Sequence, residues 1–457
     1  MIATTQHTMA SETTNILTSA VTPEQSYFKP ILNELRSVRD LDVANQNVLV
    51  RVDANVPRVP ETGEIADRSR LNGFRDTVHY LLDNEANAVI LLSHLGKGDP
   101  KSDSLRVVAD VLPEILKRPG NVPEVWFRED YASEDARDSL LREITNFKLV
   151  NPNRGLVVLL ENTRFNKGEK AGDPIFAYNL SELGTVYVND AFGAAHRADD
   201  ASVGPLAERF AHEHRASIGF LMERELARVE RVMLSAKEPF VVLLSGSKIE
   251  TKAPILEALV GGPVNDMTLI LAGETGMALA AARGLPIGAR GLSEEKLSLA
   301  RALDKAIEAK RYQVILPIDA KVVPQGSDIK KVSTFEIAEA MPEGHVIFDI
   351  GPKTVELFSK TIASKLSSGG TLVANGTVGV YENPLFKAGT VAVNEAIKKL
   401  PGSVDCLIGG GDTGVVAHEC GLPEEIISTG GGALLDAIEK GTASMPALKP
   451  LKRNAYM

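Results

Sequence analysis

Short runs of apolar residues alternate with longer amphipathic stretches along the first half of the chain. Each run has the length of one strand, and the stretches between the runs carry apolar residues at helical spacing. Continuous apolar strands of this kind are typical of a parallel sheet whose two faces are covered by helices. We predict strands at Asn47–Val52, Ala88–Leu92, Leu156–Leu160 and Val186–Val188, and helices within Asn72–Asp83 and Lys101–Leu116.

The second half repeats this alternation without a recognisable short sequence repeat. Nearly every apolar run ends in a loop that contains glycine or polar residues. Ligands of open parallel sheets bind beyond the carboxyl ends of the strands, so these loops are predicted to carry the functional residues. The runs are Phe240–Leu244, Leu269–Ala272, Val314–Leu316, Val346–Phe348, Thr371–Val373 and Cys406–Ile408.

The segment Leu221–Ala236 lies between the halves and has Leu, Val and Met at helical spacing among many charges. We interpret it as one long helix that links two lobes and stops before Pro239. Each half has about two hundred residues, a typical size for a domain. The predicted division is a disordered or weakly ordered tail at 1–40, lobes at 41–220 and 239–440, and an interdomain helix at 221–238.

Composition and charge restrict the possible functions. The 457 residues are 44 % apolar and 24 % charged, which is ordinary for a globular chain. A net charge of −10 argues against a nucleic-acid-binding surface, and no apolar stretch reaches the length of a membrane span. Cys406 and Cys420 lack metal-type spacing, which favours reduced packing residues in a cytoplasmic protein. The first twenty residues contain no Lys or Arg and lack a secretory apolar core, so we predict a tail there.

Several basic side chains in the first half lie near predicted strand ends. Loops that follow parallel strands converge on one edge of the sheet, and Arg presents a planar fork to phosphate and carboxylate groups. Any one of these residues alone is typical of a surface salt bridge, but the set favours a site for a small polyanion. The basic residues are Arg70, His94, Arg164 and Arg197, with Asp53 and Asn55 placed in a further loop to hold a hydroxyl group.

Lys248 and Lys252 follow the predicted strand Phe240–Leu244. They are four residues apart, so they share one face near the start of a helix. Two ammonium groups beside free backbone N–H groups suit a phosphate. The segment is not a Walker A loop, because the first glycine of that pattern would fall on Val241.

Two glycine turns, Gly409–Thr413 and Ser428–Ala433, follow later predicted strands. Each resembles the start of a helix, where backbone N–H groups can close on a phosphate. Asp412 at the first turn suits Mg²⁺, directly or through water. Residues 409–414 also satisfy G-x-G-x-x-G, but no acidic residue ends a strand about twenty residues later, so this dinucleotide signal is weak. Such turns are usually only tight turns; two of them with the lysine pair favour phosphate binding.

Taken in order, these segments resemble the phosphoglycerate kinase family. The resemblance runs from about Val48 to the C-terminus, and many motifs in one order make it specific. The matching segments are Arg51–Pro57, Ser93–Gly96, Glu161–Phe165, Val188–Ala198, Gly219–Leu226, Lys248 with Lys252, Asp349–Thr354, Asn375–Gly376, Gly379 with Glu382, Gly389–Thr390, Gly409–Thr413 and Ser428–Ala433.

The resemblance implies an α/β fold of two Rossmann-like lobes with parallel sheets, joined by the long helix and a hinge. It implies a cytoplasmic, monomeric enzyme of glycolysis and gluconeogenesis. This enzyme would transfer a phosphoryl group between 1,3-bisphosphoglycerate and ADP, with Mg²⁺, to give 3-phosphoglycerate and ATP. A C-terminal tail at 441–457 would return to the N-terminal lobe.

The resemblance also implies individual roles. Lys248 and Lys252 would contact the nucleotide phosphates, Glu382 the ribose and Asp412 the Mg²⁺ ion. The implied phosphoglycerate site is Asp53, Asn55, Arg70, His94, Lys97, Arg164 and Arg197. The implied nucleotide site is Ser245, Gly246, Lys248, Lys252, Gly273, Asn375, Glu382, Gly411, Asp412 and Thr413.

The implied chemistry needs little from the protein beyond position and charge. The nucleophile that consumes ATP is a carboxylate with a pKa of about 4, so it needs no general base at neutral pH. Catalysis then consists of aligning the reactants, neutralising the transferring group and expelling water by hinge closure. We expect Arg70 and Lys248 to flank that group, and backbone N–H groups to contact its oxygens. The predicted catalytic residues are Arg70, Lys248, Lys252, Gly410, Gly411 and Gly431.

The chain departs from the family pattern mainly around the predicted base pocket. Two alternatives therefore stay open: a related acyl-phosphate kinase with another nucleotide preference, and a non-catalytic binding protein on the same fold. Retention of Arg70, Lys248, Lys252 and Asp412 speaks against the second. The departures are Ser245, Ser247, Ala272–Thr275, Ala374 and Thr377 in the second half, and Lys97 and Asp199 in the first.

Overall fold

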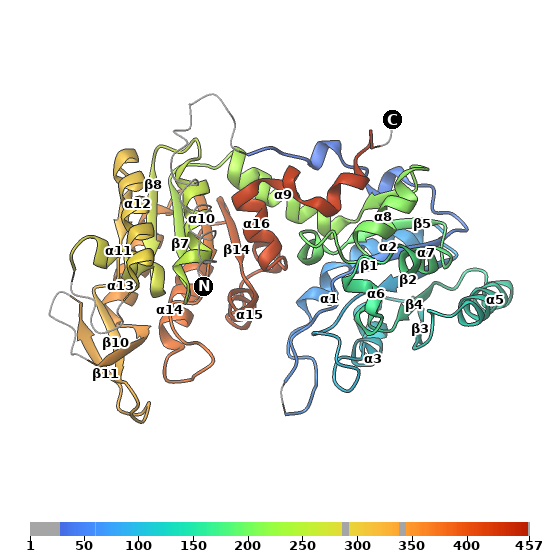
Figure 1. Ribbon diagram of the computed structural model, residues 1–457, viewed down its shortest axis with the longest axis horizontal. Helices are drawn as coiled ribbons and strands as arrows, with labels where there is room; N and C mark the ends of the chain where they lie inside the picture. Colours follow the sequence, from blue (N-terminus) through green and yellow to red (C-terminus); the bar gives the residue numbers. More distant parts are fainter. Residues whose placement is uncertain (1–27, 60, 286–291, 338–343, 456–457) are drawn as a thin grey trace, which may run out of the picture.

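The computed structural model describes residues 28–59, 61–285, 292–337 and 344–455, without the side chains of residues 411 and 412. The chain forms two α/β lobes, here called the N-lobe and the C-lobe, that lie on either side of one long helix (Figure 1). Each lobe is built on its own parallel sheet. The predicted fold class is therefore confirmed.

The N-lobe contains a six-stranded parallel sheet with strand order β3-β4-β2-β1-β5-β6. All four predicted strands are present, and their continuous apolar runs lie in the buried middle of the sheet. Two edge strands escaped prediction, because β3 is half-exposed and mixed in composition and β6 has only three residues. The strands are β1 Asn47–Val52, β2 Ala88–Leu92, β3 Glu124–Arg128, β4 Leu156–Leu160, β5 Val186–Asp190 and β6 Ala216–Ile218.

Helices cover both faces of this sheet. The predicted helix over Lys101–Leu116 is instead two single turns, because Pro113 has no N–H to donate to Ala109 and the helix must restart. The predicted helix over Asn72–Asp83 is interrupted at Phe74. The helices are α1 Ser69–Gly73, α2 Arg75–Asp83, α3 Arg106–Ala109, α4 Leu112–Ile115, α5 Glu134–Val150, α6 Lys167–Lys170, α7 Pro174–Ser181 and α8 Gly204–Ala211.

The C-lobe has a five-stranded parallel sheet with strand order β14-β13-β7-β8-β9. The run at Val346–Phe348, which the pattern assigned to this sheet, lies instead in a separate antiparallel sheet of order β11-β10-β12. Apolar periodicity indicates that a strand is buried, but it does not indicate which strand it pairs with. It therefore could not assign this run to one sheet or the other. The strands are β7 Phe240–Leu244, β8 Met267–Leu271, β9 Gln313–Ile315, β10 Asp319–Pro324, β11 Ser333–Glu336, β12 His345–Ile350, β13 Gly370–Asn375 and β14 Val404–Gly409.

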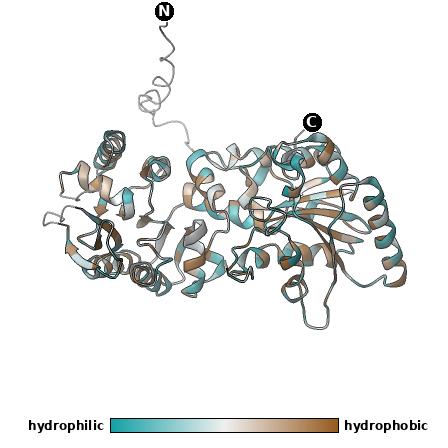
Figure 2. Cartoon of the chain, turned by 60° about the horizontal axis from the view of Figure 1, so that its bottom comes forward, coloured by the Kyte–Doolittle hydropathy of each residue, from teal (hydrophilic) through white to brown (hydrophobic). Residues whose placement is uncertain are grey.

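The C-lobe helices flank its parallel sheet, and the hydropathy view shows apolar strands enclosed by helices with hydrophilic outer faces (Figure 2). The helices are α10 Ile249–Val260, α11 Gly273–Ala282, α12 Glu294–Lys310, α13 Pro352–Lys365, α14 Ala388–Lys398, α15 Gly411–Glu419 and α16 Gly432–Lys440. Within the residues described, none of the helices combines the length and the apolar character needed to cross a membrane.

Helix α9, Phe220–Leu234, runs between the lobes and buries Leu221, Met222, Leu226 and Val229. The buried Glu230 on this helix forms hydrogen bonds with both the first and the last described segments of the chain. One Glu230 carboxylate oxygen accepts hydrogen bonds from the backbone N–H of Ile31 at 2.8 Å and from the Thr442 hydroxyl at 2.7 Å. A buried charge needs such partners, so the N- and C-terminal segments are fixed against α9.

The first described residues are ordered, which corrects the predicted tail at 1–40 from Phe28 onward. Short 3₁₀ helices lie at Leu32–Glu34 and Val38–Asp40, and Ile31, just before the first, and Val38, in the second, are buried in the core. The amphipathic spacing there was too short to be recognised as structure. Residues 1–27 lie outside the described part of the chain.

The C-terminal segment crosses to the N-lobe. Its 3₁₀ helix Pro446–Leu451 packs against α8, and Leu451 O accepts a hydrogen bond from Arg36 N at 3.0 Å. Ala447 N also donates to Ala195 O at 3.3 Å. The first and last described segments thus lie side by side, with Leu35 bridged to Lys452; they are the blue and red segments above the N-lobe in Figure 1.

Candidate active site

Loops at one edge of the N-lobe sheet bring the predicted polyanion residues together. They follow β4, β2, β1 and β5, which are neighbours in the sheet, so their carboxyl ends converge. Arg70 lies on α1 rather than in a loop, and its guanidinium forms an ion pair with the buried Asp53 carboxylate. We call Arg51, Arg70, His94, Arg164 and Arg197 the N-lobe basic cluster.

His94 lies buried at the centre of this cluster, with only 2 % of its surface exposed. Its Nδ1 lies 2.8 Å from the Arg51 guanidinium, and its Nε2 lies 3.5 Å from that of Arg197. Burial lowers the pKa of His94 well below its usual range, and the charges of Arg51, Arg164, Arg197 and Arg70 lower it further. The imidazole is therefore neutral at neutral pH.

Arg51 is a site residue that the sequence analysis did not single out. It is fully buried within β1, and its Nε donates to Ser202 Oγ at 3.0 Å. Ser202 Oγ in turn donates to the buried Glu169 carboxylate. Arg is rarely buried without a charged or polar partner. The sequence signal that could have identified Arg51 was therefore an arginine inside an otherwise apolar strand.

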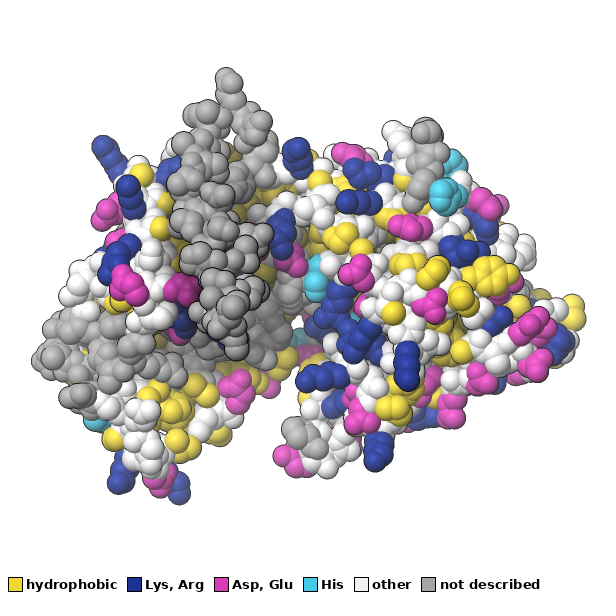
Figure 3. Space-filling model, in the orientation of Figure 1, with side chains coloured by type: hydrophobic (Ala, Val, Ile, Leu, Met, Phe, Trp, Pro, Cys, Tyr) yellow, Lys and Arg dark blue, Asp and Glu magenta, His cyan; other side chains and the backbone are white. Residues whose placement is uncertain are grey.

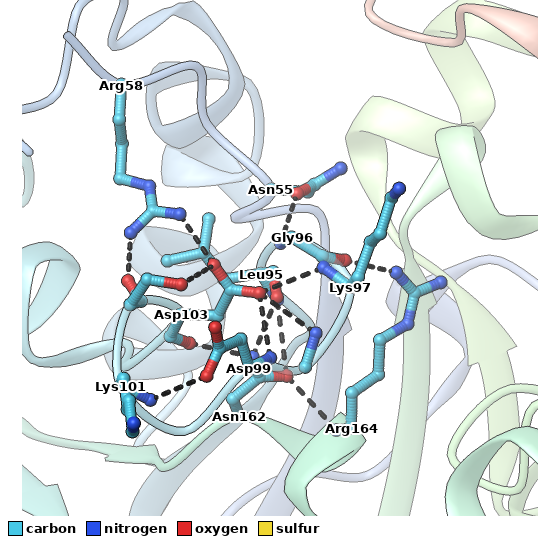
Figure 4. Close-up of polar contacts among 12 residues, drawn as sticks. Asn55, Arg58, Leu95, Gly96, Lys97, Asp99, Lys101, Asp103, Asn162 and Arg164 are labelled. Atoms are coloured by element: carbon cyan, nitrogen blue, oxygen red, sulfur yellow. Dashed lines mark hydrogen bonds and ion pairs between the residues drawn. The ribbon is translucent and has the colours of Figure 1, made fainter. Parts of the chain in front are cut away.

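A carboxylate, Asp103, organises the loop after β2 (Figure 4). Its Oδ2 accepts hydrogen bonds of 3.0 Å from the backbone N–H groups of Lys97, Gly98 and Asp99. Its Oδ1 lies 2.6 Å from the Arg58 guanidinium. Burial alone would raise the pKa of Asp103, but these hydrogen bonds prevail and lower it to about 2. The sequence analysis did not identify this residue.

The Asp103 network fixes the loop that carries Lys97. Asn55 Oδ1 accepts from Gly96 N at 2.9 Å, and the Arg164 guanidinium donates to Gly96 O. The Asn55 oxygen is thus used by the loop. In Figure 4, the Lys97 ammonium and the Arg164 guanidinium reach past this loop on the side away from Arg58. Lys97 is exposed and free to approach an anion.

The C-lobe contains a pocket of about 790 Å³ at the carboxyl ends of its parallel strands, here called the C-lobe pocket. Residues from the loops after β7, β8, β13 and β14 line it. Ser245 lies beneath the wall instead, where its hydroxyl donates to Thr377 O at 2.8 Å. The predicted residues that line the pocket are Gly246, Lys248, Lys252, Gly273, Asn375, Glu382, Gly410, Thr413 and Gly431.

One end of the pocket is polar and tightly built. The Lys252 ammonium donates to Asn375 Oδ1, and Asn375 Nδ2 donates to Gly409 O. Burial lowers the pKa of Lys252. Gly410 has a φ of 123°, and a Cβ atom there would lie 2.8 Å from Thr413 Oγ1, so only glycine suits this turn. Gly411 and Asp412 begin α15, but their side-chain environment lies outside the described part of the structure.

The other end of the pocket is apolar and was not predicted residue by residue. Hydrophobic side chains from α11, from the loop just before α12 and from the antiparallel sheet with its adjoining loops line the cavity there, which suits a flat aromatic ring. These side chains are dispersed in sequence, so no local motif marked them. They include Met277, Leu292, Pro317, Ile337, Ile347 and Phe348.

An ion pair lies in the wall of the same pocket. The Lys296 ammonium is 2.9 Å from both carboxylate oxygens of Glu274 and 3.4 Å from Glu250. Hydrogen bonding to Glu274 raises the pKa of Lys296. Of the other departures, Ser247 and Thr377 line the pocket, whereas Ala374 is buried in the sheet.

The N-lobe borders a hollow between the lobes (Figure 3). Figure 3 shows Lys and Arg side chains gathered on the N-lobe where it borders this hollow. The glycine turn before α16 is tied to the interlobe helix, since Thr429 N donates to the buried Glu225 carboxylate at 2.8 Å. A Cβ atom on Gly430 would lie 2.4 Å from the Phe192 ring of the N-lobe. The turn that carries Gly431 thus touches both lobes.

Comparisons with known proteins agree over most of the chain. The family model described as Phosphoglycerate kinase matches residues 38–441. A phosphoglycerate kinase from Chloroflexus aggregans is 36 % identical over 410 residues, which is 88 % of this chain and 96 % of that protein. One from Chlamydia trachomatis serovar L2 is 38 % identical over 415 residues, with 89 % and 96 % covered.

Solved structures give the same result. The phosphoglycerate kinase of Coxiella burnetii has a TM-score of 0.68 at 29 % identity, over 91 % of this chain and 98 % of that one. The phosphoglycerate kinase of Pyrococcus horikoshii has a TM-score of 0.71 at 25 % identity, with the same coverage.

Proposed function

Because this chain belongs to the phosphoglycerate kinase family, we propose that it reversibly transfers a phosphoryl group between 1,3-bisphosphoglycerate and MgADP, giving 3-phosphoglycerate and MgATP. The observation that carries the proposal is the pairing of two complementary sites. An arginine-rich cluster on one lobe faces a pocket on the other that combines an apolar end with two lysines. The first suits a small phosphorylated acid, and the second suits a nucleotide.

In this proposal the N-lobe basic cluster binds the phosphoglycerate. Arg164 and Arg197 offer planar forks to its phosphate and carboxylate groups, and neutral His94 holds the neighbouring guanidiniums at a set spacing. Asp53, which already orients Arg70, is placed to accept a hydrogen bond from the substrate hydroxyl. Lys97 adds a mobile positive charge at the edge.

The C-lobe pocket binds ADP or ATP. The base enters the apolar end, Glu382 holds the ribose, and Lys248 and Lys252 contact the phosphates. The backbone N–H groups at the starts of α15 and α16 are helix N-termini and favour phosphate oxygens. Gly246, Gly273 and Thr413 shape the walls.

The residues present fit a Mg²⁺ ion that arrives on the nucleotide. Such an ion usually keeps several waters and takes one or two protein carboxylates besides the phosphates. Asp412 at the start of α15 is the residue we assign to it, next to the Thr413 hydroxyl that accepts from Gly376 N at 2.9 Å. When bound, the ion neutralises charge on the phosphate oxygens.

The protein contributes alignment and charge to the transfer. The attacking 3-phosphoglycerate carboxylate is already ionised, so no side chain needs to remove a proton. Arg70 and Lys248 flank the transferring group from opposite lobes, and N–H groups near Gly410, Gly411 and Gly431 contact its oxygens. Lobe closure about α9 brings these parts together and excludes water.

The proposal includes a monomer that works in the cytoplasm without nucleic-acid or membrane partners. The net charge of −10 supports the absence of a nucleic-acid surface. Both cysteines are free, and burial raises the pKa of Cys406 to about 11, so its thiol stays protonated. A protonated, half-buried thiol is poorly reactive, which fits a packing residue.

A coupled assay of 3-phosphoglycerate phosphorylation tests the proposal. The purified chain is supplied with Mg²⁺ and, in turn, with ATP, GTP, CTP and UTP. Turnover with ATP at a kcat between about 1 and 10³ s⁻¹ is expected for an enzyme of this kind. No turnover with any nucleotide would contradict the proposed function, and turnover with GTP far above ATP would replace its nucleotide.

A further inference from the structure

One residue in the wall of the C-lobe pocket contacts both ends of the loop that carries Lys248, one end through its backbone and the other through its side chain. Glu274 is the second residue of α11, and its backbone N–H donates to Gly246 O at 2.8 Å. Its carboxylate Oε1 accepts from Ile249 N at 2.9 Å. Gly246 and Ile249 enclose Ser247 and Lys248, so Glu274 spans the loop from end to end.

The two loops approach closely enough for this because of Gly273. This residue has a φ of +58°, and a Cβ atom on it would lie 2.4 Å from Gly246 O. A side chain at residue 273 would therefore push the loops apart. The backbones of the loop after β7 and the loop after β8 pack against each other, and Glu274 lies next to that contact.

Helix α10 follows Lys248, its N-cap residue, and receives no capping hydrogen bond from the side chain of that residue. The first N–H groups of a helix lack partners within the helix. Glu274 supplies one from another loop and places a negative charge at the positive end of the helix dipole. The backbone that directs the Lys248 side chain is thereby fixed.

A carboxylate in this position carries a cost for a nucleotide site. Its charge would repel the phosphates that Lys248 and Lys252 attract. Lys296 on α12 offsets the charge through contacts of 2.9 Å to both Glu274 oxygens. The side chains of Glu274 and Lys296 are 14 % and 25 % exposed, so solvent screens the pair only in part.

We propose that Glu274 is a positioning residue for phosphoryl transfer, because it holds the loop that presents Lys248, and that Lys296 keeps the charge of Glu274 from opposing the nucleotide. The inference rests on the proposed function of the C-lobe pocket.

Hydrogen exchange tests the structural half without any nucleotide or turnover. Amide exchange is measured for residues 245–252 in the wild type, Glu274→Ala and Glu274→Gln. We expect exchange at Ile249 to become about tenfold faster in Glu274→Ala, the equivalent of one charge-assisted hydrogen bond. Glu274→Gln keeps an oxygen acceptor and should stay close to the wild type. Equal protection in Glu274→Ala and the wild type would overturn the positioning role.

Kinetics test the link to catalysis. Glu274→Ala should lower kcat about tenfold and leave the KM for 3-phosphoglycerate unchanged, because Lys248 is misdirected in the transition state. Glu274→Gln should recover most of that loss. A change in KM alone would overturn the positioning role. If the wild type fails to phosphorylate 3-phosphoglycerate, the proposed function falls, and the exchange result still decides whether Glu274 holds the loop.

Calorimetric titration with MgADP tests the role of Lys296. Lys296→Met should raise the Kd about fivefold, and the double variant Glu274→Gln/Lys296→Met should return to within about twofold of the wild type. Arg301→Met is the matched control, since Arg301 lies on the same helix and pairs with exposed Glu294 at 2.6 Å. A Kd for Lys296→Met equal to that of the control, or no recovery in the double variant, would overturn the charge-offsetting role.

Discussion

The two halves of the candidate active site manage positive charge in different ways. In the N-lobe, the arginines are already engaged: Arg70 with Asp53, Arg164 with Gly96 O, and Arg51 with His94. In the C-lobe pocket, the Lys248 ammonium makes no hydrogen bond or ion pair with any part of the chain that the structure describes. The N-lobe cations are thus preassembled by contacts within the chain, whereas the Lys248 ammonium is left available for a ligand.

The two sites also differ in the residues that line them. The N-lobe basic cluster is polar throughout, so its affinity depends on charge and orientation. The C-lobe pocket adds an apolar end, which contributes burial of the base independently of charge. In the proposed function, fixed cations select the acid, and the less restrained lysine supplies the catalytic charge. The predictions below test that division.

The largest expected effect is on Lys248. Lys248→Ala should lower kcat by about 10²–10³, because it removes a cation that acts in the transition state. The KM for 3-phosphoglycerate should change little, since the acid binds on the other lobe. Steady-state kinetics with the coupled assay measure both values. Lys360→Ala, on an exposed i,i+4 pair with Glu356, is the control.

A KM effect on MgATP without loss of kcat would contradict this assignment. Lys248 would then be a binding residue like Lys252. The contrast between engaged and available cations would then no longer explain catalysis. The same assay at several salt concentrations distinguishes general charge effects from a specific contact.

The second effect concerns Asp103, which holds the N-lobe loop. Asp103→Asn should lower the free energy of unfolding by about 1–3 kcal/mol, because three backbone N–H groups and Arg58 lose a charged acceptor. The KM for 3-phosphoglycerate should rise severalfold while kcat stays similar. Urea unfolding and the coupled assay measure these changes.

The control for Asp103 is Asp99→Asn in the same loop, where the carboxylate only accepts from Lys101 N at 3.0 Å. It should change stability by less than about 0.5 kcal/mol. Because the pKa of Asp103 is lowered to about 2, its contribution is present at neutral pH and is lost as pH falls from about 4 towards 2. Equal stability of the two variants would contradict a preassembled N-lobe site.

Asp103 also illustrates what could not be predicted from the sequence. His94, Arg164 and Asn55 were found because they follow apolar strands that the hydropathy pattern located. Asp103 lies in an irregular loop, and its importance comes from three N–H groups that turn towards it in space. Turn geometry of that kind is not encoded in residue spacing, so only the fold revealed it.

The third effect is a pH dependence from His94. In the folded state its pKa lies well below the value of about 6.5 expected in the unfolded chain, so below that pH only the unfolded chain takes up the proton. The free energy of unfolding should therefore fall as pH decreases from about 6.5. His94→Gln should flatten this dependence by up to about 1.4 kcal/mol per pH unit. Urea unfolding between pH 5 and 8 measures it; an unchanged slope would mean that His94 already carries a proton among the arginines.

The C-lobe shows a second limit of sequence analysis. Its phosphate-binding end was located through Lys248, Lys252 and the glycine turns, since each is a local pattern. The apolar end combines Met277, Leu292 and Phe348 from three separate parts of the chain. Phe348 belongs to an antiparallel sheet, which apolar periodicity did not distinguish from the parallel one. A surface formed by distant, chemically ordinary residues carries no local signal.

The smallest expected effect is on Lys97, the one cation of the N-lobe site whose side chain is exposed. Its backbone is already fixed, because its N–H donates to Asp103 and its carbonyl accepts from Lys170 Nζ at 2.9 Å. Lys97→Arg changes only the head group, from a point charge to a planar fork. The KM for 3-phosphoglycerate should fall about two- to threefold at low salt, and the gain should shrink at 0.5 M salt because an exposed charge is screened. A larger gain that persists at high salt would mean that residue 97 belongs to the preassembled cluster. The contrast between engaged and available cations would then hold for individual residues and not for the two lobes.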